Sequence, residues 1–390
     1  MSKKAGDRET GIPPRVLAVG GGKGGVGKSV ASIVLAATYA TSGRRVVLMD
    51  LDLGAANLHT YLGLHGDTPG VADFLLRRVP SLEDLLLDSS LPGVRLLSGA
   101  RFYPGMANLA YQTKAKLIRH IKGLNADVVI MDLGAGVHFN VLDFFGISRP
   151  GLVTLAPEPG SVLNAYAFLK SGLFRHLTGV FGKHPDIRPL LENARVNFGD
   201  ESTFNIDHFR SVIRAIDPDI VGLVEEVANG FKPALVMNQV TDLVSAVYAD
   251  NLQKLVHRRL GLRVHYLGNL PSVPGLSRHL VDLPRFLNAP GGAPLMREAT
   301  TIIEDLETTF PLPTGASRAA GGNGDERGRL KTYFGDEELQ ALSLMLDHAP
   351  DSLFEGTKRS SWKLRLFYKP TEVVRFLLEH GIKAPVFFSD

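Results

Sequence analysis

Two lysines and a serine stand within a glycine-rich run near the start of the chain, at Lys23, Lys28 and Ser29. The run 20–29 reads G-G-G-K-G-G-V-G-K-S and, from its third glycine, fits the phosphate-loop pattern G-x-x-x-x-G-K-[ST]. Such a loop points backbone N–H groups at phosphates, while its second lysine reaches the β- and γ-phosphates and its serine ligates Mg²⁺. An apolar run before it and a helical pattern after it disfavour a glycine-rich turn without a ligand. The sequence therefore predicts a site for a nucleoside triphosphate.

Carboxylates follow two other apolar runs. Asp50 and Asp52 stand two residues apart after one run, and Asp132 ends another. An aspartate at the end of a strand beside a phosphate loop typically binds Mg²⁺ through a water, which is the role predicted for Asp132. Of the other two, one carboxylate can support the Mg²⁺ shell while the other accepts a hydrogen bond from the attacking water. A helix N-cap is the competing interpretation of Asp52, and His138 is more often a polar loop residue than a sensor of hydrolysis.

The scaffold that would position these residues can be read from short apolar, β-branched runs between helical patterns. They lie at 16–19, 46–49, 94–97, 128–131, 152–156, 234–237 and 264–267. Runs this short and continuously apolar suit strands buried on both faces of a parallel sheet. We expect a doubly wound α/β fold of the P-loop NTPase kind, with a mainly parallel sheet of about seven to eight strands flanked by helices. Ligands bind at the carboxyl ends of the strands in such folds.

The domain organisation predicted for the 390 residues has one large domain and a small one. Residues 1–14 are a flexible N-terminus, and residues 15–310 form the P-loop ATPase domain with an insertion at about 176–233. Within the insertion, 206–216 and 221–227 have helical periodicity. A linker rich in Gly, Ala and Pro covers 311–328. Residues 329–390 are expected to form a small C-terminal module of α/β or mostly helical character.

Composition excludes several classes of protein. The formal net charge of +3 is too small to argue for nucleic acid by itself. No apolar run approaches the roughly 20 residues that span a bilayer, and the polar start of the chain does not look like a signal peptide. We therefore expect a cytoplasmic protein. The chain has no cysteine, so it has no thiolates to hold an iron–sulfur cluster.

Several motifs resemble one family. The loop K-G-G-V-G-K-S resembles the deviant Walker A loop of the ParA/MinD superfamily. D-L-D-L-G-A-A-N-L-H, followed by Y-L-G-L, resembles switch I of its MinD/FlhG (FleN, YlxH) branch, and D-L-G-A-G at 132–136 is similar to the switch II of FlhG. The stretch 152–167 looks like another family segment, with Gly160 where threonine is usual. The resemblance covers about 15–175 and 234–309.

This resemblance implies roles for particular residues. Lys23 would cross a dimer interface to the phosphates of the partner subunit, against the alternative of a solvated surface lysine, and Asp52 would be the catalytic aspartate. The catalytic set is then Lys23, Lys28 and Asp52, and the Mg²⁺ set is Ser29, Asp52 and Asp132. The nucleotide-binding set is Gly22, Lys23, Gly24, Gly25, Val26, Gly27, Lys28, Ser29, Val30, Asn238 and Pro271. Because Gln239 replaces the lysine of the guanine-specifying N-K-x-D, ATP is favoured over GTP.

The function implied is an ATPase switch that forms a homodimer with ATP and hydrolyses it slowly, with Mg²⁺ and an unidentified protein activator. It would regulate the placement or number of a structure such as a flagellum or a division site. One alternative is a ParA-like partitioning ATPase on nucleic acid, which is less favoured because the main domain lacks a concentrated basic helix. Another is a metabolic P-loop enzyme of the same fold. The iron–sulfur relatives of this family are excluded by the missing cysteines.

Two features of the branch are not found: an activator segment D-Q-A-x-x-L-R before the loop, and a basic amphipathic helix at the end of the chain. Residues 358–369 instead interleave basic and aromatic side chains. Their alternation places Trp362, Leu364, Leu366 and Tyr368 on one face, which predicts a strand in the small module. The alternative is a peripheral contact with the inner face of the cell membrane, since Trp, Tyr and clustered Lys/Arg suit such a surface.

Overall fold

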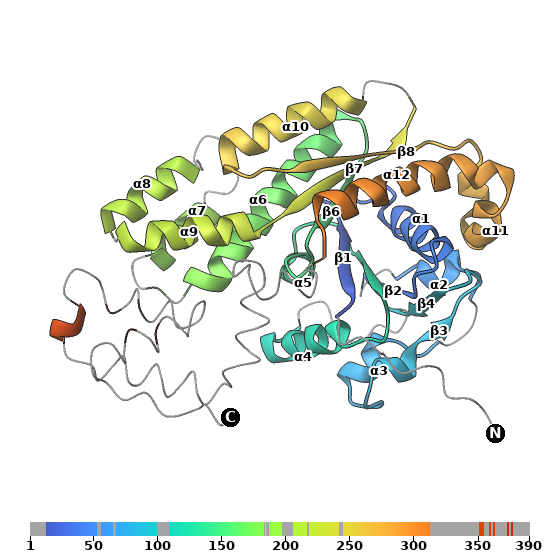
Figure 1. Ribbon diagram of the computed structural model, residues 1–390, viewed down its shortest axis with the longest axis horizontal. Coiled ribbons are helices and arrows are strands. Elements are labelled where there is room, and N and C mark those ends of the chain that lie inside the picture. The colour runs from blue at the N-terminus through green and yellow to red at the C-terminus, as the bar shows by residue number, and fades with distance from the viewer. Residues whose placement is uncertain are drawn as a thin grey trace. The chain divides into compact units, whose positions relative to one another are not determined.

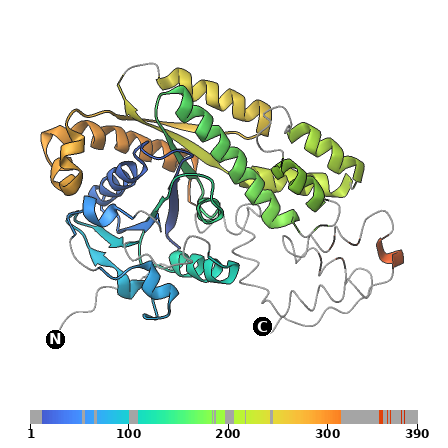
Figure 2. The same cartoon turned by 180° about the vertical axis from the view of Figure 1, so that it is seen from behind.

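The structure is a computed structural model (Figures 1 and 2). It describes residues 13–52, 56–64, 68–99, 109–182, 184, 187–196, 206–216, 218–241 and 245–312, and in the C-terminal region 351–354, 359, 362, 373 and 376. The chain divides into two compact units, residues 1–175 with 232–312 and residues 176–231 with 313–390. All residues predicted to act on the nucleotide belong to the first unit.

The first unit is built on an eight-stranded sheet with the order β3-β4-β2-β5-β1-β6-β7-β8. The strands are β1 (Arg15–Gly20), β2 (Val46–Leu51), β3 (Leu87–Asp88), β4 (Val94–Leu97), β5 (Val128–Leu133), β6 (Gly151–Leu155), β7 (Pro233–Val240) and β8 (His265–Pro271). All neighbours pair in parallel except β3 and β4, which are antiparallel. The seven predicted strands are all present, so the predicted doubly wound fold is confirmed. The two-residue β3 was not predicted, because it is too short to show a period.

Helices flank this sheet on both sides (Figure 1). Those of the first unit are α1 (Lys28–Thr41), α2 (Leu58–Tyr61), α3 (Val71–Leu75), α4 (Tyr111–Lys122), α5 (Phe139–Phe145), the start of α6 (Pro159–Phe181), α10 (Ser245–Leu260), α11 (Leu283–Leu287) and α12 (Ala293–Thr309). Short 3₁₀ turns are η1 (Glu83–Leu85), η3 (Leu276–Asp282) and η4 (Pro290–Gly292). Leu17 and Val19 of β1 face a core shared with α1 and α12. Because side chains alternate along a strand, Ala18 and Gly20 face the other layer.

Helix α1, which begins directly after the phosphate loop, is the most enclosed helix of this core. Every residue from Ala31 to Tyr39 is buried, although the helix carries Ser32 and Thr38 among its apolar residues. A helix buried on all sides must be apolar on nearly all sides, which explains the run A-S-I-V-L-A-A-T-Y. The phosphate loop is therefore joined at its C-terminal end to an element that packing holds in place.

Two glycines make room for one aromatic ring on the opposite face of the sheet. A Cβ at Gly151 would lie 2.5 Å from Phe145 Cζ, and a Cβ at Gly20 would lie 2.8 Å from Phe168 Cζ and 3.0 Å from Phe145 Cδ2. The Phe145 ring meets Phe168 edge-on, with centroids 4.9 Å apart and planes at 90°. Phe145 thus sits in a slot that exists only because β1 and β6 carry no side chain there.

The second unit holds the end of α6, helices α7 (Ile187–Val196), α8 (Ile206–Ile216) and α9 (Pro218–Gly230), and the 3₁₀ turn η5 (Asp351–Phe354). Helices therefore occupy both stretches of the insertion that have helical periodicity. Buried Phe209 and Ile213 of α8 and Val224 of α9 supply its apolar interior. Among the described residues, no helix is both long enough and apolar enough to cross a membrane.

The predicted strand 362–368 lies outside the described residues except for Trp362. Trp362 itself has helical backbone geometry, which is against a strand at that position. Its ring stacks on Phe376, with centroids 3.7 Å apart and planes 17° apart. This contact favours a role for Trp362 in the packing of the unit. The linker 311–328 and the module boundaries stay predictions.

Candidate nucleotide-binding site

The glycine-rich run forms a loop between the last residue of β1 and the first residue of α1. Gly25 and Gly27 both have φ of +81°, a left-handed conformation that residues with a Cβ adopt only at a cost. The Gly27 carbonyl accepts the first helical hydrogen bond, from Ala31 N at 2.9 Å. Backbone of this kind in front of a helix N-terminus gathers N–H groups into a concave anion site.

Gly27 also stands too close to its neighbour to accept a side chain. A Cβ there would lie 2.2 Å from Asn238 Nδ2, whereas at Gly43, with a similar φ of +79°, nothing lies within 4 Å. We expect Gly43→Ala to lower the free energy of unfolding by about 1–2 kcal/mol, the cost of the left-handed backbone alone. Gly27→Ala should cost about 1–3 kcal/mol more, because Asn238 must move. Urea unfolding of both variants measures the difference, and equal losses would contradict the clash.

The side chain of Lys28 is buried at the mouth of this loop, where its Nζ donates a hydrogen bond to Lys23 O at 3.3 Å. Burial lowers the pKa of Lys28, and the charges of Asp132 and Asp52 partly offset that effect. An ammonium group that has lost its water and has few protein partners is well suited to bind an anion.

Asp132, the residue before the last of β5, interacts electrostatically with Lys28 and is buried. Ser32 donates a hydrogen bond from its hydroxyl to Asp132 Oδ1 at 3.0 Å, and Ser29 bonds the same carboxyl group. Burial raises the pKa of Asp132 to about 6 in spite of these two hydroxyls and the nearby Lys28. Ser32 was not singled out from the sequence, although its place one helical turn after Ser29 could have indicated it.

Asp50, in β2, and Asp52, just after it, differ in burial and in hydrogen-bond partners. Asp50 is buried, its Oδ1 accepts Asp52 N and its Oδ2 accepts Leu58 N, both at 3.1 Å. Burial, with the charge of Asp132, raises the pKa of Asp50 to about 8. Asp52 is half-buried and faces the turn after β5, since a Cβ at Gly134 would lie 3.1 Å from Asp52 Oδ1. Asp50 thus holds the backbone in place, and Asp52 is the carboxylate left to meet a ligand.

The donor set fits a magnesium ion. Asp132, Ser29 and Asp52 offer two carboxylates and a hydroxyl, the oxygen ligands that Mg²⁺ takes together with phosphate and water. Burial raises the pKa of Asp132 and of Asp50, and a divalent cation favours the charged form of such groups. No group of three or more His, Cys, Asp or Glu side chains among the described residues forms a metal site without the phosphates. The arrangement therefore suits a metal that arrives with a nucleotide.

Lys23, on the outer side of the loop, is half-exposed and forms an ion pair with Glu158 at 2.9 Å. Glu158 lies directly before α6, in the stretch 152–167 that resembles a family segment, and its pairing with Lys23 was not predicted. His138 is exposed before α5. Within the single chain, Lys23 therefore points away from the loop interior that Lys28 occupies.

The ends of β7 and β8 reach the loop from the other side. Asn238 donates from Nδ2 to Val26 O at 2.9 Å and to Gly27 O at 3.3 Å. Gln239 donates from Nε2 to Gly25 O at 3.0 Å. Pro271 pairs with Val240 at the end of β8 and is half-buried. The predicted residues of the phosphate loop, Asp52, Asp132 and Asn238 are thus gathered at the carboxyl edge of the sheet, while Gln239 as a loop contact was not predicted.

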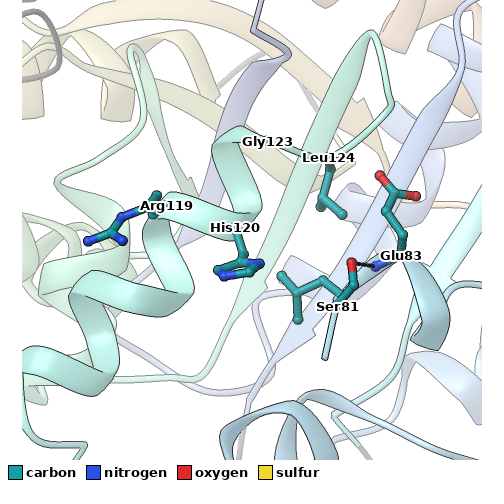
Figure 3. A pocket seen from close by; sticks show the side chains of 7 residues that line it. Ser81, Glu83, Arg119, His120, Gly123 and Leu124 are labelled. Atoms are coloured by element: carbon teal, nitrogen blue, oxygen red, sulfur yellow. Dashed lines mark hydrogen bonds between the residues drawn. The ribbon is translucent and has the colours of Figure 1, made fainter. Parts of the chain in front are cut away.

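A separate hollow of about 210 Å³ lies between α4 and the turn η1, lined by Ser81, Leu82, Glu83, Arg119, His120, Gly123 and Leu124 (Figure 3). Glu83 N donates to Ser81 Oγ at 3.1 Å in its wall. Leu124 leads into the start of β5, so this hollow belongs to the amino edge of the sheet. It is not part of the site described above.

A phosphate loop after a central β1, with a buried aspartate at the end of the neighbouring β5, defines a P-loop nucleotide-binding fold. The family model described as the CobQ/CobB/MinD/ParA nucleotide binding domain matches residues 17–282. Since this is more than half of the chain, the chain belongs to that family, as its motifs indicated.

Relatives within the family are similar over different lengths. The chain is 39% identical over 162 residues to the antiactivator FleN of Pseudomonas aeruginosa, a match that spans 40% of this chain and 56% of FleN. It is 24% identical over 251 residues to the septum site-determining protein MinD of Escherichia coli K12, spanning 62% of this chain and 91% of MinD. The solved structure of MinD from Pyrococcus horikoshii with Mg-ADP is similar with a TM-score of 0.51 and 16% identity, covering 76% of this chain and 98% of that one. This structural likeness supports the fold alone.

Proposed function

We propose that this protein is an ATP-driven switch: it binds ATP with Mg²⁺ at the phosphate loop, dimerises, and is reset by slow hydrolysis. The observation that carries the proposal is the pair of lysines with different surroundings. Lys28 is buried in the loop, and Lys23 is half-exposed on its outer side. One lysine is placed to hold the phosphates of its own chain, and the other, held only by an exposed ion pair with Glu158, is placed to reach a second molecule.

In this mechanism each residue has a separate task. Lys28 and the loop N–H groups bind the phosphates, while Ser29 and Asp132 would hold Mg²⁺, which would neutralise charge on the phosphates. Asp52, half-buried beside the turn at Gly134, accepts a hydrogen bond from the attacking water and orients it. Lys23 of one subunit stabilises the charge that develops on the phosphates held by the other, as an arginine finger does.

The role proposed for the switch is the spatial regulation of a cellular structure. The relatives by sequence include an antiactivator, FleN, and a septum site-determining protein, MinD. Slow turnover suits such a task, since a switch must keep its ATP-bound surface long enough to report a position. A protein activator of hydrolysis and a surface that the dimer binds complete the proposal. In the ParA-like alternative, the surface that the ATP-bound dimer binds is nucleic acid.

Sedimentation with anionic liposomes or with DNA, each with ATP and with ADP, tests this proposal. We expect liposome binding that requires ATP, at a basal turnover well below the roughly ten per second of a median enzyme. ATP-dependent sedimentation with DNA would select the partitioning alternative. Turnover near ten per second without any partner would indicate a metabolic enzyme.

The dimer is expected to depend on Lys23 and not on its partner within the chain. Lys23→Ala should abolish ATP-induced dimerisation in light scattering while the affinity for ADP stays unchanged. Glu158→Gln should keep dimerisation within about fivefold, because an exposed ion pair contributes at most about 1 kcal/mol. Lys254→Ala is the matched control, since Lys254 also forms an exposed ion pair, with Asp250 at 2.6 Å. Loss of ADP binding in Lys23→Ala would contradict a role across the interface.

A further inference from the structure

Two neighbouring side chains at the end of β7 hold the backbone of the phosphate loop. Gln239 Nε2 donates to Gly25 O at 3.0 Å, and Asn238 Nδ2 donates to Val26 O at 2.9 Å and Gly27 O at 3.3 Å. Three consecutive carbonyl groups of the loop are thus bonded by two amides from one strand. Asn238 is buried and Gln239 is exposed.

A regular strand could not make this contact. Consecutive side chains of a strand point to opposite faces, so Asn238 and Gln239 would diverge. The β7–β8 ladder instead shifts register between Met237 and Val240, and Gln239 has φ of +60°. Register shifts of this kind redirect side chains, and a left-handed non-glycine residue costs on the order of 1–2 kcal/mol. The irregular backbone brings both amides to the same loop.

The contact determines where the N–H groups of the loop point. A trans peptide unit is planar, with its C=O and N–H directed to opposite sides. Carbonyls of Gly25 and Val26 that are bonded toward β7 therefore turn the N–H groups of Val26 and Gly27 away from it, whereas the carbonyl of Gly27 also accepts Ala31 N of α1 at 2.9 Å. These are the groups that a phosphate loop presents to phosphate oxygens.

We propose that Gln239, together with Asn238, is a positioning residue that holds the loop in its phosphate-binding form before any ligand arrives. Binding then does not require the loop to be ordered first, and preorganisation of this kind raises the affinity for the ligand. The proposal rests on the proposed binding of nucleotide by this loop. It assigns to Gln239 a part in phosphate affinity rather than in recognition of the base.

The test compares a ligand that has a base with one that has only phosphates. Isothermal titration in the presence of Mg²⁺ measures the affinity for ADP and for inorganic pyrophosphate in Gln239→Met, which keeps length and neutrality but removes the donor. We expect both affinities to fall by the same factor, about three- to tenfold, as for the loss of one hydrogen bond. Gln253→Met is the matched control, because Gln253 donates to Val264 O at 2.8 Å away from the loop, and it should leave both affinities unchanged.

A second measurement keeps the proposal testable if a variant is less stable. Amide hydrogen exchange of the unliganded protein should be faster at Val26 and Gly27 in Gln239→Met, and not in Gln253→Met. A fall in ADP affinity with unchanged pyrophosphate affinity would overturn the proposal in favour of a base contact. Unchanged affinities and exchange in Gln239→Met would also overturn it. A wild-type protein that binds neither ligand would instead refute the proposed nucleotide site.

Discussion

Lys28→Met is expected to weaken nucleotide binding strongly and to leave the unliganded protein as stable as the wild type or more so. Burial lowers the pKa of Lys28 in the folded state. Its proton is therefore held more tightly in the unfolded chain, so at neutral pH the charged side chain destabilises the fold. Methionine removes that penalty and keeps most of the volume. Because hydrogen bonds to charged groups contribute about 1.5–3 kcal/mol, the affinity for ADP should fall by roughly ten- to a hundredfold or more.

Lys114→Met provides the control for this result. Lys114 is as buried as Lys28 but forms an ion pair with Asp143, which also accepts bonds from Arg175 at 2.6 and 2.9 Å. Removing this ammonium should lower the melting temperature and leave ADP affinity unchanged. Thermal melting and calorimetric titration of both variants make the comparison. A Lys28→Met protein that is less stable and still binds ADP would contradict the assignment.

Asp52→Asn is expected to lose ATP hydrolysis by about a hundred- to ten-thousandfold, the usual contribution of a residue that positions or accepts a proton in the transition state. Binding of ATP should persist, so the variant should accumulate as an ATP-bound dimer. Phosphate release in single-turnover experiments and light scattering with ATP measure the two effects. Wild-type turnover in this variant would exclude Asp52 as the carboxylate that orients the water.

Asp50→Asn distinguishes the structural role of Asp50 from the catalytic role proposed for Asp52. Both oxygens of Asp50 accept backbone N–H groups. In asparagine an NH₂ group takes the place of one oxygen, and this group has a similar shape but cannot accept a hydrogen bond. A buried donor then lacks its partner, which costs about 1–3 kcal/mol. Burial raises the pKa of Asp50 to about 8, so removal of its charge offsets part of this cost. We expect a net fall in the melting temperature for Asp50→Asn, whereas Asp52→Asn should show none.

The fold was predictable because its strands are local features of the sequence. Seven buried strands of a parallel sheet are short apolar runs, and the turns after them carry the glycines and aspartates of the site. The strand β3 was not predicted because Leu87–Asp88 is defined by its pairing with β4, and two residues are too few to show a strand period. For 362–368 the alternation predicted a strand, and the helical geometry of Trp362 differs from it.

The site was predictable in its residue types more than in its contacts. The loop, Asp52 and Asp132 follow from motif and position, but their roles stay predictions. The partners of Lys23 and of the loop carbonyls depend on residues 135 and more than 200 positions away. Gln239 in particular reaches Gly25 only through a local irregularity of β7 that no periodicity encodes. Sequence patterns predict single helices and strands, whereas these contacts depend on how two such elements pack against each other.

The slot around Phe145 ties the sizes of the residues at positions 20, 145 and 151 to one another. Gly20, Gly151 and Phe145 occupy one volume, and a methyl group at Gly151 would lie 2.5 Å from the ring. Close packing means that such a methyl group must be matched by a smaller residue at 145. A larger residue at 151 is therefore tolerated only if the residue at 145 becomes smaller at the same time or beforehand, in which case a cavity forms first. Across related sequences, the sizes of the residues at 145 and 151 should vary in opposite directions.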